Sequence, residues 1–233
     1  MKITHADVWK NKPSEINSFV SKEVHLSFPV LRKAKVKLVL DIACGNGLGV
    51  SLPLMKEGYE VYSFDHWKSA VKSLEKNARK EGFTSKGRTS NMYKKFPYKN
   101  SFFDASFCFQ AIYHGSLSQI ESTLKEIKRV TKKRGYFFGT FIPHYIKEDK
   151  GKSFFNYTMK NGKIGRIYVK VDKKDKFLCY NLAKNCEYMV PHYHFTKENL
   201  SKILKKYFRE VSIKKLIRPH DKCISIWFVR CKI

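Results

Sequence analysis

Two acidic residues stand at the ends of short apolar segments that have the pattern of strands. Asp41 lies in Val36–Ile42, and Asp65 follows Tyr59–Phe64. After the first segment, the turn Ala43–Gly47 contains small side chains, which let a backbone approach a ligand closely and adopt positive φ. The next helix N-terminus offers free N–H groups to a carboxylate, and the second acid suits a ribose diol. These features predict a site for a nucleoside-type ligand.

A dinucleotide-binding domain also combines a glycine-rich turn with an acid, so the glycine spacing has to separate the two kinds of site. The dinucleotide pattern is G-x-G-x-x-G. Counted from Gly45, its third glycine falls on Val50, and Gly49 stands one residue early. The pattern from Asp41 to Gly47 is instead D-x-(G/A)-x-G-x-G, which favours a ligand that has no pyrophosphate.

Further side chains suited to acid–base chemistry follow the fourth predicted strand and recur in the run His192-Tyr193-His194. We expect Tyr113, His114 and His192 to line an acceptor pocket, where a histidine can take up a proton near neutral pH. A purely structural hydrogen-bonding role for His114 is the alternative. His192 and His194 share a face in an extended chain, but no clear third ligand accompanies them, so we predict no metal site.

The segments around these residues alternate between strand and helix patterns. Strands are predicted at 36–42, 59–64, within 86–91, at 103–109 and at 136–142. Helices are predicted at 14–28, after the first turn to about 57, at 67–80 and at 118–131. This order predicts an α/β fold with a doubly wound, seven-stranded, mostly parallel Rossmann-like sheet. Ser14 and Ser118 are predicted N-caps, and Pro29 is expected beyond the end of the first helix.

Residues 143–195 interrupt the alternation of strand and helix. They are rich in aromatic residues and lysine, and we interpret them as an insertion with short strands that covers the acceptor site. Residues 1–35 are predicted to form an N-terminal helical lid. A helix at 197–207 and an antiparallel hairpin of strands at about 209–217 and 223–231 close the chain. We expect residues 1–233 to form a single domain.

The charge balance is strongly basic, with 47 Lys and Arg residues against 20 Asp and Glu residues and a formal net charge of +27. Such a charge attracts phosphates, so RNA is a candidate partner. The lysines are spread along the chain, which is typical of a solvated surface.

The six cysteines form no CxxC pair, which favours free thiols in a reducing cytoplasm. No apolar run approaches the roughly 20 residues of a membrane span, so we expect a cytoplasmic protein without membrane contact.

Four segments, in order along the chain, resemble motifs of class I S-adenosylmethionine (SAM)-dependent methyltransferases. They are Val39–Gly47 (VLDIACGNG), Tyr59–Trp67 (YEVYSFDHW), Phe103–His114 and Glu126–Gly135. This resemblance runs from about residue 36 to 142. A looser similarity at both ends, in Val8-Trp9 and in Val190–Thr196, is to small methyltransferases of the tellurite-resistance and thiopurine-methyltransferase-like kind.

The resemblance implies that SAM is the cofactor, and it assigns SAM-binding positions. They are Asp41, Ala43, Cys44, Gly45, Gly47, Asp65, His66, Trp67, Asn91, Met92, Phe109 and Gln110. The first acid would orient the methionine amino group through the turn, and the second would bind the ribose hydroxyls. His66 and Trp67 would flank the adenine, for which simple helix packing of Trp67 is the alternative.

The same resemblance places Asn91 and Met92 beside the adenine, and Phe109 and Gln110 beside the methionine part of SAM. Two residues depart from the family pattern. Ala43 stands where the family has its first glycine, a change that is tolerated where φ is negative. Asn91 stands where the family often has an aspartate.

Methyl transfer from SAM is a direct displacement at carbon, to which a protein mainly contributes proximity and alignment. A small-molecule acceptor is our first expectation, because the chain is compact and the aromatic insertion can enclose a small ligand. RNA (tRNA or rRNA) is the alternative acceptor, from the net charge and the mixing of aromatic and basic residues in 153–180. A non-catalytic SAM-binding module is the third hypothesis. We expect a monomer or a homodimer.

Overall fold

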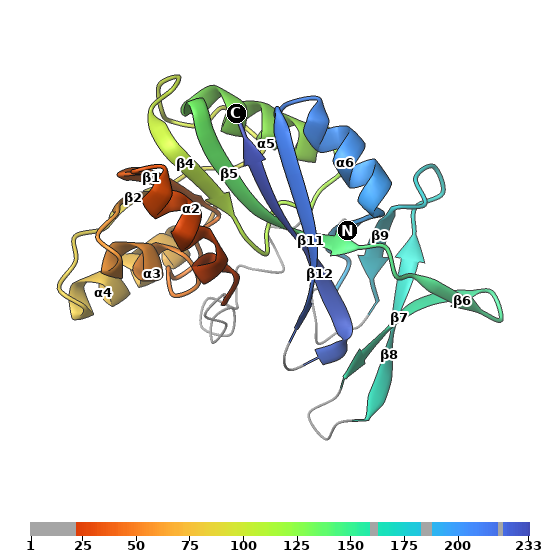
Figure 1. Ribbon diagram of the computed structural model, residues 1–233. Helices are drawn as coiled ribbons and strands as arrows, with labels where there is room; N and C mark the ends of the chain where they lie inside the picture. The colour runs from red at the N-terminus through yellow and green to blue at the C-terminus, as the bar shows by residue number, and fades with distance from the viewer. Residues whose placement is uncertain (1–21, 159–162, 183–187, 219–220) are drawn as a thin grey trace.

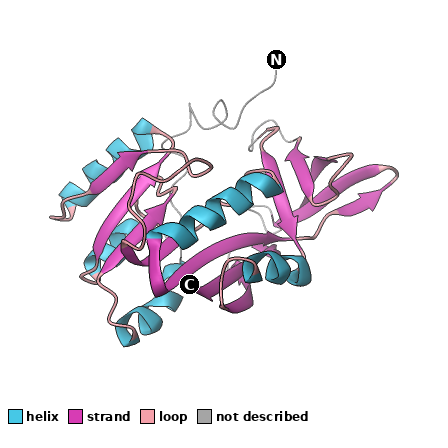
Figure 2. Ribbon diagram, turned by 90° about the horizontal axis from the view of Figure 1, so that it is seen from above, coloured by secondary structure: helices cyan, strands magenta, loops and turns pink. Residues whose placement is uncertain are grey.

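The computed structural model describes residues 22–158, 163–182, 188–218 and 221–233. Within these ranges, helices pack on both faces of a long, twisted sheet (Figure 1, Figure 2). The helices are η1 (Lys22–Ser27), α2 (Phe28–Lys33), α3 (Ser51–Lys56), α4 (Lys68–Lys80), α5 (Leu117–Val130) and α6 (Lys197–Lys205).

Seven strands form the part of the sheet that the helices cover. They are β1 (Leu38–Ile42), β2 (Glu60–Asp65), β3 (Lys86–Thr89), β4 (Phe103–Cys108), β5 (Thr131–Pro143), β11 (Glu210–Arg218) and β12 (Asp221–Lys232). The order is β3-β2-β1-β4-β5, all parallel, and β12 then pairs antiparallel with β5 and with β11. The predicted doubly wound, mostly parallel α/β sheet with an antiparallel C-terminal hairpin is therefore confirmed.

The insertion adds five more strands to this sheet. They are β6 (Lys147–Asp149), β7 (Lys152–Thr158), β8 (Ile164–Val171), β9 (Leu178–Asn181) and β10 (Pro191–Phe195). β6 to β10 pair antiparallel in sequence order, and β10 joins the far end of β5 through the parallel register His194↔Ile142. The sheet thus has twelve strands in the described residues. The predicted number of seven was too small, because β5 extends past β4 and offers a free edge to β10.

Two hydrophobic clusters, one on each face of the sheet, hold the helices in place. α5 and α6 contribute Leu124 and Leu200 to the first cluster, where they meet Ile42 and Phe64 from β1 and β2. α2, α3 and α4 contribute to the second cluster, together with strand residues such as Val39. Residues that are neighbours along a strand point to opposite faces, so each buried strand needs apolar side chains in succession.

The described portion of the N-terminal segment differs from the prediction at Pro29. The expected N-cap Ser14 and most of the helix predicted at 14–28 lie outside the described residues, as does most of the expected lid. Pro29 does not follow the end of a helix, because it stands in the first turn of α2. A proline is tolerated there since the first N–H groups of a helix have no intrahelical partner.

The N-cap of α5 also lies two residues earlier than predicted. Ser116, not Ser118, has the extended backbone of a cap and accepts a hydrogen bond from the Gln119 N–H. The Gln119 side chain in turn accepts a hydrogen bond from the Ser116 N–H, at 2.9 Å, which completes a capping box. This cap fixes where the chain leaves the segment after β4 and enters α5.

The turn between β1 and α3 is built from residues in the left-handed backbone region. Gly45 and Gly47 have φ of 54° and 81°, and Ala43 has φ of 57°. The condition under which alanine replaces the first glycine without strain, a negative φ, is not met. The alanine Cβ is crowded in this region, at a cost of roughly 1–2 kcal/mol. The close course of the chain past β2 therefore imposes strain at Ala43.

Replacing Ser116 with alanine should lower the free energy of unfolding by about 1 kcal/mol, because α5 loses its N-cap. The matched variant Ser118→Ala should change it by less than about 0.5 kcal/mol, as is usual for an exposed helix position. Urea unfolding followed by circular dichroism measures both. Equal losses for the two variants would contradict the assignment of the cap.

Replacing Ala43 with glycine should raise the free energy of unfolding by up to about 1 kcal/mol, since relief of strain outweighs the added entropy of the unfolded chain. Ala34→Gly is the control, because Ala34 has a φ of −81° at the end of α2. That variant should be destabilised. Thermal unfolding of both variants tests the prediction. A loss of stability in Ala43→Gly as large as that in Ala34→Gly would contradict it.

Candidate cofactor and acceptor site

The two acids of the sequence motif lie at the carboxyl ends of neighbouring parallel strands. β1 and β2 pair with Asp41 opposite Ser63, so Asp65 ends its strand just beyond Asp41. The intervening turn crosses between them, and two hydrogen bonds fix it. The Gly45 N–H donates to Asp65 Oδ2 at 2.9 Å, and the Cys44 N–H donates to the Phe64 carbonyl at 3.0 Å. The structure thus brings both acids and the glycine turn together.

Asp41 is buried, with 1% of its surface exposed. Its Oδ2 accepts a hydrogen bond of 2.6 Å from the Ser51 hydroxyl, which lies 2.8 Å from the Ser63 hydroxyl. Burial raises the pKa of Asp41 to about 7, and the charge of Asp65 adds to the effect. A cationic group bound nearby would favour the ionised form. Asp41 is therefore poised to respond to a positively charged ligand.

Asp65 is buried too, and the backbone holds it by both carboxylate oxygens. Besides the Gly45 contact, Oδ1 accepts a hydrogen bond of 2.9 Å from the Trp67 N–H. Burial raises the pKa of Asp65, and the two backbone hydrogen bonds oppose that rise. Each oxygen has further lone-pair capacity, so the carboxylate can still accept hydrogen bonds from a diol.

The residues expected around an adenine lie close to Asp65. His66 is exposed and Trp67 half-buried, with their rings edge to face at 5.0 Å. The Ser90 N–H donates to the Asp65 carbonyl at 2.9 Å, which brings Asn91 to the same edge. Asn91 Oδ1 accepts a hydrogen bond of 2.8 Å from the Tyr93 N–H, so its side chain shapes the turn.

Two of the expected cofactor positions have packing roles. Met92 is buried in the cluster under α5. Phe109 packs in the cluster under α2, α3 and α4, with its ring 6.0 Å from that of Phe228. Phe109 therefore supports the site from within the core on that side of the sheet.

Gln110 adopts a left-handed backbone conformation where the chain leaves β4, with φ of 58°. Its N–H donates to Thr140 Oγ1 of β5 at 2.7 Å. Its Oε1 accepts a hydrogen bond of 3.2 Å from the Tyr113 hydroxyl, and its carbonyl lies 3.2 Å from His114 Nε2. Gln110 thus ties the end of β4 to two of the three residues expected in the acceptor pocket.

The three residues expected to line the acceptor pocket meet in one cluster. The ring centroids of His114 and His192 are 4.7 Å apart, and those of Tyr113 and His192 are 6.1 Å apart. A backbone hydrogen bond from the Tyr193 N–H to the Tyr113 carbonyl, at 2.8 Å, joins β10 to the segment after β4. All three side chains are buried. Tyr113, His114 and His192 thus form one buried polar cluster next to the end of β4.

The other two residues of the 192–194 run do not join this cluster. His194 lies in a separate aromatic group, 5.3 Å from the Tyr145 ring, and its Nδ1 is 3.2 Å from the Pro143 carbonyl. Burial lowers the pKa of His194 to about 3, so this side chain stays neutral. Tyr193 packs against Phe195 in the core.

Sequence reasoning did not single out Ser51, Ser63 and Thr140, which are fully buried and hydrogen-bonded in the site. The sequence signal that could have indicated these three residues is a hydroxyl side chain within an otherwise apolar strand or helix. In the described residues, no group of three or more His, Cys, Asp or Glu side chains could hold a metal ion.

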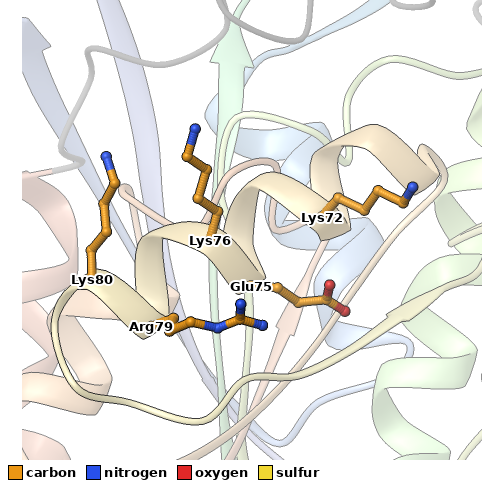
Figure 3. A pocket seen from close by; sticks show the side chains of 5 residues that line it. All are labelled: Lys72, Glu75, Lys76, Arg79 and Lys80. Atoms are coloured by element: carbon orange, nitrogen blue, oxygen red, sulfur yellow. The ribbon is translucent and has the colours of Figure 1, made fainter.

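A hollow of about 450 Å³ lies along α4, away from the strand ends. Figure 3 shows its lining, in which Lys76 and Lys80 extend to one side of the helix and Glu75 and Arg79 to the other. All of its lining side chains are charged, so this hollow is a solvated surface and has no part in the cofactor site.

The methyltransferase domain family model matches residues 40–139, which contain both acids, the glycine turn and the segment after β4. No curated protein matches the chain.

Solved structures with this fold cover almost the whole chain. The PH0226 protein of Pyrococcus horikoshii OT3 is 17% identical, with a TM-score of 0.68, covering 97% of this chain and 99% of its own. A SAM-dependent methyltransferase of Methanosarcina mazei is 18% identical, with a TM-score of 0.61. The match covers 88% of this chain and 96% of that protein. The 1,6-didemethyltoxoflavin-N1-methyltransferase of Burkholderia thailandensis, with S-adenosylhomocysteine bound, is 14% identical, with a TM-score of 0.63. The match covers 97% of this chain and 80% of that protein. The chain thus has the class I methyltransferase fold, and its residues 40–139 match the methyltransferase domain family.

Proposed function

We propose that this protein is a SAM-dependent methyltransferase that acts on a small-molecule acceptor. The observation that carries the proposal is the pair of buried acids, Asp41 and Asp65, at the ends of adjacent parallel strands, with the Gly45 N–H of the intervening turn donating to Asp65. Ligands of open α/β sheets bind at this edge. The family model over residues 40–139 and the fold shared with methyltransferases support the same reading.

The chain's own residues fit SAM at this edge. Asp65 would accept hydrogen bonds from the ribose hydroxyls, while His66, Trp67 and Asn91 would surround the adenine. Asp41 would favour the positively charged methionine part of SAM, which lies against the strained turn. A cation there stabilises the ionised carboxylate, so the raised pKa of Asp41 falls when SAM binds.

When bound, SAM supplies an electrophilic methyl group on a sulfonium centre, which leaves as a thioether. The protein's part in the displacement is to align the acceptor atom with that methyl group at about 3 Å. His114 and His192 would accept the proton that a neutral acceptor loses. Gln110 holds Tyr113 and His114 in position from the end of β4.

A small molecule is the first choice of acceptor because the Tyr113, His114 and His192 cluster is buried. Such a site admits a small reacting group and excludes water. RNA is the second candidate, favoured by the exposed basic and aromatic face of the insertion described below.

No helix of the described residues is long and apolar enough to cross a membrane. The cytoplasmic location, the single domain and the monomeric or dimeric state remain predictions.

The proposal is tested in two stages. Calorimetry with SAM measures cofactor binding, and mass spectrometry then detects S-adenosylhomocysteine after incubation with panels of small thiols, amines and phenols, or with RNA. Turnover with a small molecule supports the first choice, and turnover with RNA alone supports the second. A protein that binds SAM without turnover would be a binding module, and one that ignores SAM would overturn the assignment.

Asp41→Asn should weaken SAM binding and remove most of its pH dependence. In the wild type the acid must lose its proton to favour a cation, so the dissociation constant should rise about tenfold for each pH unit below 7. Calorimetry between about pH 6 and about pH 8, roughly one unit to either side of that pKa, measures the slope. Glu121→Gln, which removes an exposed ion pair with Lys206, is the control and should keep the wild-type slope.

The same variant should change the pH dependence of stability. The pKa of Asp41 is raised from 3.8 to about 7, so the folded wild type retains a proton that the unfolded chain loses. Wild-type stability should therefore fall as pH rises from about 4 to about 7 and then level off. Asp41→Asn should show a smaller fall, since the raised pKa of Asp65 remains. Thermal unfolding across this range would contradict the prediction if both proteins behaved alike.

His114→Asn and His192→Asn should each lower turnover by about a hundredfold with the acceptor that the assay identifies, and leave the affinity for SAM unchanged. His144→Asn is the matched control, because His144 is exposed and packs against Phe177 outside the cluster. Steady-state kinetics and SAM titration separate the two effects. Wild-type turnover in both cluster variants would remove histidine from the mechanism.

A further inference from the structure

Four strands of the insertion, β6 to β9, form an antiparallel sheet with an inner and an outer face. Along β8 the inner position Val169 is buried, whereas Ile164 and Tyr168 are 57% and 44% exposed. The inner position Phe155 of β7 packs toward the body, with its ring 5.7 Å from that of Tyr145. The outer face of β8 therefore points to solvent, whereas the outer position Phe154 of β7 is only 5% exposed.

Aromatic and apolar side chains gather on this outer face. Tyr168 lies opposite Phe154 in the register of β7 and β8, and their rings are 6.1 Å apart. Tyr180 lies opposite Lys170 in the register of β8 and β9, which places it on the same side. Exposed aromatic rings on a sheet are flat surfaces on which bases can stack.

Cations surround these rings. Directly paired residues share a face, so Lys147, Lys152, Arg166 and Lys170 lie on the outer side, with Asp149 as their acidic neighbour. The Arg166 guanidinium lies 4.4 Å from the centre of the Phe154 ring and 3.0 Å from Asp149. The outer face thus has a positive balance next to its aromatic rings.

A hollow of about 460 Å³ opens on the outer face across β6, β7 and β8. Phe154, Ile164 and Arg166 line it, together with Glu148 and Asp149. Apolar side chains and charged groups of both signs therefore meet in this depression of the surface.

We propose that this outer face binds single-stranded RNA, through stacking on Tyr168 and Tyr180 and through phosphate contacts with Lys152 and Lys170. Combined basic and aromatic surfaces bind single strands with little sequence preference. A second copy of the chain fits less well, since two positively charged faces repel each other. His192 pairs with Cys179, whose side chain is on the inner face, so the RNA surface is separate from the acceptor cluster.

The proposal concerns binding alone and does not rest on methyl transfer, so it can fail or hold independently. Fluorescence anisotropy of the full chain with a labelled oligouridylate of roughly 12 nucleotides, a length within the site sizes of such surfaces, measures it without SAM. Tyr168→Ala should weaken binding about tenfold, whereas Tyr168→Phe, which keeps the ring, should bind like the wild type. Lys152→Gln with Lys170→Gln should reduce the salt slope by about 1.4.

The control removes equal charge from a basic surface that lacks aromatic rings. Lys72→Gln with Lys76→Gln on α4 (Figure 3) should leave the salt slope unchanged. Equal loss in both lysine pairs, or wild-type affinity of Tyr168→Ala, would show that binding follows overall charge and would overturn the proposal. So would no binding at about 50 mM salt, or sedimentation that shows Tyr168→Ala separating a dimer into monomers.

Discussion

The cofactor edge of this protein depends on two carboxylates that the fold removes from water. Burial of a charge is costly unless hydrogen bonds replace the lost solvent. Asp41 receives the Ser51 hydroxyl, and Asp65 receives the backbone N–H groups of Gly45 and Trp67. These contacts compensate only in part, because the pKa of each acid remains raised. The site therefore favours a ligand that brings positive charge and hydroxyl donors to the same edge.

Two of the seven non-glycine residues with positive φ in the described part of the chain lie at the same edge. Ala43 and Gln110 directly follow the neighbouring strands β1 and β4, and both have positive φ. Residues other than glycine rarely adopt this backbone conformation. Such residues persist where the surroundings fix them, and they are common at binding sites. Here the turn is held by Phe64 and Asp65, and Gln110 is held by Thr140. Strain and buried charge thus meet where ligands of this fold class bind.

The insertion connects two kinds of surface through one sheet. Its last strand, β10, pairs with β5 and brings His192 against Tyr113 and His114. Its other strands turn the exposed Tyr168 ring and several cations outward. Because neighbouring residues of a strand point to opposite sides, one short segment can complete a buried cluster and also present a separate surface to solvent.

The sequence alone determined the order of strands and helices in the body, the two acids and the glycine turn, because each depends on residues close together in the chain. Hydrophobic periodicity and small residues reveal such local structure. Tertiary structure decided the rest. The meeting of His192 with Tyr113, the joining of β10 to β5 and the partnership of Ser51 with Asp41 link distant segments. The positive φ of Ala43 and the cap at Ser116 likewise follow from how the neighbouring chain packs, which no local pattern records.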